Sequence, residues 1–137
     1  MRIATWNVAY GRGRPANARR LRRIEEVDAD VWILTETHDE LSLADAGYSP
    51  VHADQRPTTG AREVIEGSRW VSIWSRLPVS ERIADLADPR RTAAAVIDAA
   101  DRRVVVYGTV LPCYHDTEVG RAGASRSGAR TPRPVKG

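Results

Sequence analysis

Strand, helix and strand signals follow one another in the first third of the chain, and this order constrains the fold most. Residues 1–8 predict a strand covered on both faces, because both alternating sets of side chains are largely apolar. Apolar residues at spacings near three in residues 18–27 predict a helix, with Asn17 as its N-cap and Asp28 at its end. The apolar run of residues 31–35 predicts a buried strand, so this part is a βαβ-like unit of an α/β protein.

Strand signals dominate the next stretch of the chain. Residues 39–69 are polar and irregular, and predict loops with short strands at most. Residues 70–75 alternate with period two and predict a strand. Residues 91–98 and 103–110 predict two paired strands, joined by a polar turn at residues 99–102.

The charge of the chain is concentrated in its last residues. Residues 1–116 hold 16 Arg against 17 Asp and Glu, whereas residues 117–137 carry a net charge of +4. This last segment is rich in Gly, Arg and Pro and has no apolar periodicity, which predicts a disordered tail. We therefore expect a nearly neutral folded part at residues 1–116 and a basic tail at residues 117–137.

Length and cysteine content limit the class of protein. The 137 residues suit one domain, and the sequence has no apolar run near the ~20 residues that span a bilayer. The N-terminus lacks the apolar segment of a secretory signal. Cys113 is the single cysteine, which excludes a disulfide framework and a multi-cysteine zinc site. These features favour a cytoplasmic protein.

Two polar residues follow the predicted strands of the βαβ-like unit. Asn7 ends the first strand and Glu36 ends the second. If the strands are parallel neighbours, both side chains emerge at the edge of the sheet where ligands of α/β proteins bind. A carboxylate beside an amide oxygen suits Mg²⁺ or Mn²⁺. The alternative is that Glu36 is an ordinary surface or capping residue.

Four segments in order resemble the endonuclease/exonuclease/phosphatase superfamily. They are residues 3–8 (IATWNV), 30–37 (DVWILTET), 70–78 (WVSIWSRLP) and 103–112 (RVVVYGTVLP). The family pattern is a strand ending in Trp-Asn, a strand ending in a metal-binding Glu, a strand ending in Ser-Arg-x-Pro, and a further strand leading into the site. The resemblance covers about residues 1–116.

The resemblance implies a fold and a site. The fold would be the N-terminal half of a two-sheet α/β sandwich with α-β-β-α layers, followed by the disordered tail. Glu36 would bind Mg²⁺ or Mn²⁺, and Asn7 would bind the metal or orient the phosphate. His38 would face the substrate, where some relatives carry a basic residue; the alternative is an exposed loop residue. The implied reaction is metal-dependent hydrolysis of a phosphoester.

The sequence departs from the family in its second half. It has no Gly-Asp-x-Asn segment and no late Asp-His pair, and the order in His115–Asp116 is reversed. We therefore expect a truncated or frameshifted product that has little activity alone. The substrate class stays open among nucleic acid, phospholipid and inositol phosphate.

Three other interpretations stay open. The chain could be a non-catalytic module that binds nucleic acid or phosphate with its basic tail. A separate chain could supply the missing half. The sheet face that lacks its usual cover, with Trp6, Trp32, Trp70 and Trp74 as core-facing bulk, also predicts self-association.

Overall fold

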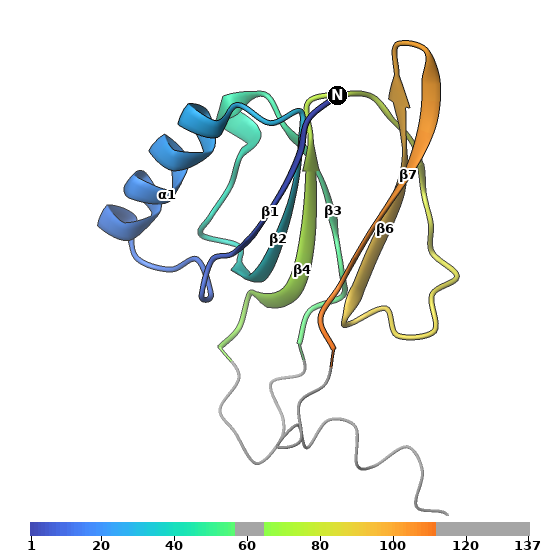
Figure 1. Cartoon of the computed structure of the whole chain (residues 1–137). Coiled ribbons are helices and arrows are strands. Elements are labelled where there is room, and N and C mark those ends of the chain that lie inside the picture. Colours follow the sequence, from blue (N-terminus) through green and yellow to red (C-terminus); the bar gives the residue numbers. More distant parts are fainter. Residues whose placement is uncertain (57–64, 112–137) are drawn as a thin grey trace, which may run out of the picture.

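The computed structural model describes residues 1–56 and 65–111 of the chain (Figure 1). Its elements are β1 (Ile3–Asn7), α1 (Arg14–Val27), β2 (Val31–His38), the 3-10 turn η1 (Ala44–Ala46), β3 (Ser49–His52), β4 (Ser68–Ser75), β5 (Val79–Arg82), β6 (Thr92–Ala99) and β7 (Arg102–Thr109). They form a four-stranded sheet in the order β1-β2-β4-β3 and a three-stranded sheet in the order β5-β6-β7.

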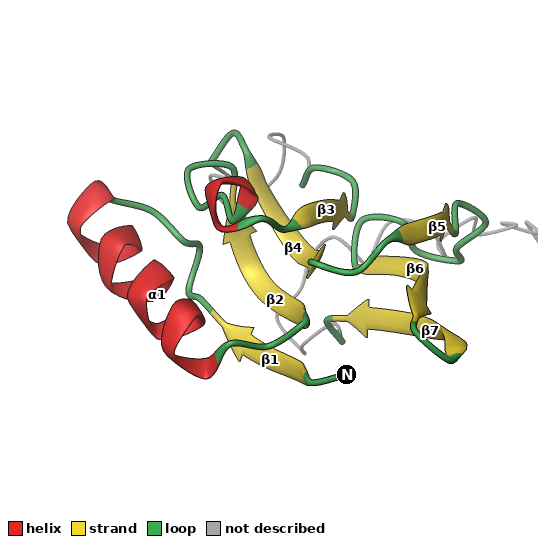
Figure 2. Cartoon of the chain, turned by 90° about the horizontal axis from the view of Figure 1, so that it is seen from above, coloured by secondary structure: helices red, strands yellow, loops and turns green. Residues whose placement is uncertain are grey.

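The elements are arranged in layers. Helix α1 and η1 lie on one face of the four-stranded sheet, and the three-stranded sheet packs on its other face (Figure 2). The described residues thus supply the α-β-β part of the expected sandwich, which confirms the predicted fold class. Among the described residues, no helix has the length and apolar character needed to cross a membrane.

The predicted βαβ unit is present, with one correction. Strands β1 and β2 are parallel neighbours, and Ile3 pairs with Val31. Asp28 caps the C-terminal end of α1, where the sequence predicts the helix to end, and has a left-handed conformation with φ 50°. The helix begins at Arg14 after Gly13, so the prediction that Asn17 caps it is wrong. Asn17 lies buried within the first turns because its amide satisfies loop carbonyls.

The prediction that the first strand is covered on both faces is also wrong. On one face of β1, Ala4 and Trp6 pack against the helix-side core. On the other face Ile3 is 43% exposed, and Thr5 and Asn7 are exposed as well. The reason is that β6 and β7 pack mainly against β2, β3 and β4, so the second sheet leaves β1 largely uncovered.

The two sheets approach closely because small residues line the contact. The core between them contains Ala93 and Ala95 of β6 opposite aliphatic residues of β2 and β4. At Gly108 of β7, a β-carbon would lie 2.7 Å from Cγ2 of Ile33 and 2.8 Å from Cγ1 of Val71. Such distances leave no room for a side chain, so glycine is required by packing here.

Other predictions stand as follows. The strand at 70–75 and the strands at 91–98 and 103–110 are confirmed, with bounds shifted by one or two residues. The irregular stretch 39–69 contains η1 and β3, and β5 follows β4 without having been predicted. Trp32 and Trp74 are buried, and Trp6 and Trp70 are partly buried. Trp6, Trp32 and Trp74 pack on the helix side and only Trp70 lies between the sheets, and strands β6 and β7 cover much of that face, so the expectation of an uncovered sheet face is wrong. The predicted tail at 117–137 and the His115–Asp116 pair lie outside the described residues.

Candidate metal and phosphate site

The parallel pair β1 and β2 brings Asn7 and Glu36 together. Asn7 pairs with Thr35, the residue before Glu36, and the next N–H, that of Val8, donates to the Thr35 carbonyl oxygen at 3.0 Å. The Tyr10 N–H donates to the carbonyl oxygen of Glu36 itself. We call this edge, at the carboxyl ends of β1 and β2 (lower end in Figure 1), the rim. Strand β2 continues two residues beyond Glu36, to His38.

The backbone of the rim is strained. Ala9, Tyr10 and Gly11 have φ values of 48°, 68° and 50° in succession, and Glu36 across from them has φ 52°. Left-handed conformations of non-glycine residues cost roughly 1–3 kcal/mol each and persist only where the surroundings enforce them. Because the strain falls on Glu36 and on the loop that follows Asn7, beside the two residues that the sequence predicts to be functional, it supports a site here.

Two residues outside the rim hold its loop in place. The buried Asn17 donates from Nδ2 to the carbonyl oxygens of Gly11, at 2.7 Å, and Glu40, at 3.2 Å. The N–H of Gly13 donates to Glu40 Oε2 at 3.0 Å. That hydrogen bond lowers the pKa of the Glu40 carboxyl. The loop of residues 9–13 is therefore tied to both α1 and the end of β2.

The donor groups of the rim fit a hard cation. Asn7 Oδ1 accepts the Ala9 N–H at 2.9 Å, which orients the amide oxygen and leaves it a second lone pair. Glu36 is half-buried and its carboxylate has no hydrogen bond or ion pair to the described residues. Residues 1–56 and 65–111 contain no group of three or more His, Cys, Asp or Glu side chains placed to hold a metal ion. One carboxylate and one amide oxygen match Mg²⁺, which keeps several of its waters.

His38 lies at the end of β2 with both ring nitrogens engaged. Nδ1 accepts the Glu40 N–H at 3.1 Å, and Nε2 lies 2.8 Å from the carbonyl oxygen of Glu66. The side chain is only 10% exposed. A contact between His38 and substrate therefore requires one of these hydrogen bonds to be given up, and the contact stays a prediction.

Four side chains that the sequence analysis does not assign to the site gather beside the rim. We call Tyr10, Arg56, Trp70 and Arg91 the cation–aromatic cluster. The Arg56 guanidinium carbon lies 3.8 Å from the Trp70 ring centre, and that of Arg91 lies 5.1 Å from it. Arg56 also donates to the Tyr10 hydroxyl at 3.2 Å. The members come from four separate segments, so no local pattern in the sequence could predict the cluster.

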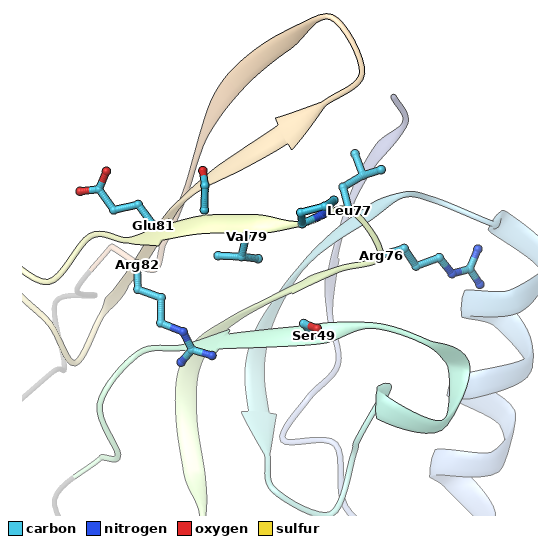
Figure 3. Close-up of a pocket in the computed structure, with 8 residues that line it drawn as sticks. Ser49, Arg76, Leu77, Val79, Glu81 and Arg82 are labelled. Atoms are coloured by element: carbon cyan, nitrogen blue, oxygen red, sulfur yellow. The ribbon is translucent and has the colours of Figure 1, made fainter.

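A second groove lies at another edge of the sandwich, and its arginine side chains are engaged with other protein groups. It is lined by Ser49 of β3 and by residues 76–82, and its volume is about 490 Å³ (Figure 3). Arg82 points towards β3 and donates to the Pro50 carbonyl oxygen at 2.7 Å, whereas Glu81 points away. Arg76 pairs with Asp28 and lies over the Tyr48 ring. Ser75 pairs with Val31 at the start of β2, so Ser75 and Arg76 lie at the opposite end of β4 from the rim.

Several solved structures resemble this chain, among them the following three. An endonuclease/exonuclease/phosphatase from Beutenbergia cavernae is 21% identical with a TM-score of 0.56, and the alignment covers 84% of this chain and 39% of that one. The endonuclease domain of the telomere-specific non-LTR retrotransposon TRAS1 is 12% identical, with a TM-score of 0.60 and coverages of 81% and 46%. TDP2 from Caenorhabditis elegans is 15% identical, with a TM-score of 0.56 and coverages of 80% and 34%.

These similarities concern the fold. No protein-family model and no curated protein matches the sequence. The chain spans less than half the length of each of the three solved structures. The described part of this chain therefore has the endonuclease/exonuclease/phosphatase fold, over part of the length of such proteins.

Proposed function

We propose that the rim is part of the active site of a metal-dependent phosphoester hydrolase, with Asn7 and Glu36 as the residues that hold Mg²⁺ or Mn²⁺. The observation that carries the proposal is the placement of these two oxygen donors on adjacent parallel strands, with Glu36 in a strained left-handed conformation. The fold shared with an endonuclease/exonuclease/phosphatase supports it.

In this proposal Glu36 and Asn7 bind the metal ion, and the loop of residues 9–13 positions Asn7. The Glu36 carboxylate would anchor the cation, and the Asn7 amide oxygen, oriented by the Ala9 N–H, would complete the protein ligands. A metal ion bound there supplies Lewis-acid stabilisation of the phosphoryl oxygens. The strained loop of residues 9–13 would keep Asn7 within reach of Glu36 before substrate arrives, so that less ordering is needed on binding.

Turnover would need groups beyond those of the rim. The sequence has neither Gly-Asp-x-Asn nor a late Asp-His pair, and the structures it resembles are more than twice as long as the portion they share with it. General acid–base catalysis alone contributes about 10²–10⁴ in rate. We therefore propose that this chain binds the metal but hydrolyses phosphoesters weakly or not at all unless a second polypeptide supplies the remaining groups.

Metal binding by the purified chain tests the proposal. Titration with Mn²⁺, followed by the loss of the free-ion electron paramagnetic resonance signal, should show one site. Glu36→Gln should weaken that site at least about ten-fold, because it replaces the charged ligand with a neutral one. Asn7→Ala should have a smaller effect.

Glu81→Gln is the matched control, because Glu81 is exposed on β5 and points away from β3. It removes the same charge and should leave Mn²⁺ binding unchanged. Equal binding by the native chain, Glu36→Gln and Glu81→Gln would contradict the proposal.

A further inference from the structure

Strand β7 presents one backbone edge that no other strand covers in the described part of the chain. It is an end strand of the three-stranded sheet and pairs with β6 alone. The Val110 N–H donates to the Arg91 carbonyl oxygen at 3.1 Å, so these two residues form a hydrogen-bonded pair at the end of the ladder. Hydrogen-bonded and non-hydrogen-bonded pairs alternate in an antiparallel ladder, so every second residue of β7 directs its backbone N–H and carbonyl away from β6. These residues are Arg103, Val105, Tyr107 and Thr109.

A hydrogen bond on the other side of β6 confirms this alternation. Ala94 pairs with Tyr107, and its carbonyl oxygen accepts the Ile83 N–H at 3.0 Å on the side of β5. The pair of Ala94 and Tyr107 is therefore not hydrogen-bonded across the ladder. Within residues 1–56 and 65–111, the outward backbone groups of β7 have no hydrogen-bond partner. We call this row of backbone groups the free edge of β7.

The free edge of β7 lacks the features that protect edge strands. Such strands are commonly short, interrupted by a proline or a bulge, or lined with charges. Strand β3 has four residues and includes Pro50, and β5 has four residues with a register shift against β6. Strand β7 has eight residues in continuous register with β6, and its two arginines stand at one end. Its outward side chains at the centre, Val105 and Tyr107, are 62% and 57% exposed, so the centre of the free edge is apolar and accessible.

The bare face of β1 lies beside this edge. Strand β6 packs on β3 and β4, whereas β7 packs on β4 and β2, so a strand added beyond β7 would lie over β2 and β1 (Figure 2). That face of β1 carries Ile3, which is 43% exposed, and the exposed Thr5. One added strand would therefore satisfy the free edge and cover the apolar Ile3 side chain at the same time.

A second copy of this chain does not fit the free edge through its own β7. Strand β1 extends beyond β7 in each copy, so two β7 strands placed side by side would bring β1 of each copy under β7 of the other. The two β1 strands would then compete for the same space. A single extended segment brings no second layer with it and avoids this overlap.

From these contacts we propose that the free edge of β7 binds an extended segment of a second polypeptide, which adds a strand to the three-stranded sheet. Main-chain hydrogen bonds supply affinity in this mode of recognition, and alternate side chains supply specificity. The segment has no proline, turns apolar side chains towards Ile3, and has no cation opposite Arg103, where like charges would repel. The inference rests on the proposed function in one respect, because it describes how the second polypeptide invoked there attaches.

Amide hydrogen exchange of the full chain, resolved by residue with NMR in EDTA, is the first test. In the chain alone, the amides of Val105 and Tyr107 should exchange at least about ten-fold faster than those of Val104 and Val106, because only the latter two are directed to β6. The probe is a nine-residue peptide of alternating threonine and valine with blocked ends. Adding it should slow exchange at Val105 and Tyr107 and leave Val104 and Val106 unchanged.

Val105→Pro tests the hydrogen bonds of the free edge directly. It removes an N–H that points away from β6, and proline is tolerated on the open side of an edge strand. It should weaken binding of the fluorescein-labelled peptide, measured by anisotropy, at least about ten-fold. Val105→Lys keeps the N–H but places a charge at the centre of the edge, so it should also weaken binding and serves if the proline variant does not fold.

Ile3→Thr and Ile65→Thr form a matched pair that tests the contribution of β1. The two isoleucines are 43% and 41% exposed, but Ile65 lies in the segment before β4 and not on β1. Ile3→Thr should weaken peptide binding about three-fold, because less apolar surface is buried. Ile65→Thr should bind the peptide as the native chain does.

Three results would overturn the inference. The first is equal protection of the Val105 and Val106 amides in the chain alone, which would show that the edge is already covered; sedimentation would then tell a second copy from residues beyond 111. The second is unchanged exchange at Val105 when the peptide is added. The third is equal peptide binding by the native chain, Val105→Pro and Val105→Lys. Glu36→Gln should bind the peptide as the native chain does, so failure of the proposed metal site and failure of this inference are distinguishable.

Discussion

Asn17, within α1, donates a hydrogen bond from Nδ2 to the carbonyl oxygen of Gly11 at 2.7 Å. The same nitrogen donates to Glu40 beyond the end of β2, and Oδ1 accepts from Arg20 at 2.8 Å. One buried amide therefore joins the helix to the strained loop of the rim. The residue that resembles a helix cap in the sequence is instead the link between helix and site.

Asn17→Ala should destabilise the protein by about 1–3 kcal/mol, because it leaves the buried carbonyl oxygen of Gly11 without its donor. Urea denaturation followed by circular dichroism measures the change in the free energy of unfolding. Arg22→Ala, on the exposed face of the same helix, should change it by less than about 0.5 kcal/mol. Equal stabilities of the two variants would show that the contacts of Asn17 are dispensable.

Glu36→Gly should stabilise the protein although it removes the proposed metal ligand. Glycine adopts a φ of 52° without the strain of a β-carbon, so a gain of about 1 kcal/mol is expected. Glu36→Ala keeps the β-carbon and should show no such gain. The two variants are compared by thermal unfolding, and a Glu36→Ala variant as stable as Glu36→Gly would argue against strain at this position.

Gly108→Ala should destabilise the contact between the sheets. The added methyl group would overlap Ile33 and Val71, and forcing extra atoms into a packed core costs typically about 1–3 kcal/mol. Val105→Ala on the same strand is the control, because Val105 is 62% exposed. Denaturant titration of both variants should show a clear loss for Gly108→Ala alone.

The free energy of unfolding should decrease as the pH is lowered, because His52 becomes protonated. Its Nδ1 lies 2.8 Å from Ser72 Oγ and its ring packs edge-on against Trp74, and burial of the ring lowers its pKa below the ordinary value. The unfolded chain then binds a proton at about pH 6.5, before the folded one does, so the unfolded state gains stability as pH falls below that value.

The free energy of unfolding should therefore decrease between about pH 7 and pH 5, and His52→Gln should flatten this dependence. Denaturant titrations at intervals of half a pH unit measure both slopes. Identical slopes in the native chain and His52→Gln would assign the dependence to other groups.

Local periodicity was sufficient to predict most of the elements. The spacing of Leu21, Ile24 and Val27 predicted α1, and the alternation of residues 70–75 predicted β4, because these patterns record which face of each element is buried. The start of α1 was misplaced because Asn17 suits both a cap and a buried amide. Short strands such as β3 and β5 have too few residues for a periodic signal.

The sequence predicts the candidate site only through strand order. Asn7 and Glu36 were identified because each follows an apolar strand, and adjacent parallel strands end at the same edge. Arg56 and Arg91 were not identified, because their contact with Trp70 depends on the packing of one sheet against the other. The φ value of Glu36 is likewise a property of the folded backbone, which no residue pattern reports.

Strands β2 and β4 contribute to both cores, with Trp32, Leu34 and Trp74 on the helix side and Val31, Val71 and Ile73 between the sheets. Helix α1 and strand β6 therefore depend on the same two strands, although they lie on opposite sides of the sheet. Opening either core removes support from the other, so the layers form one cooperative unit. Backbone amides of β2 and β4 should exchange with deuterium last, and those of α1 and β6 should become exposed in the same unfolding event.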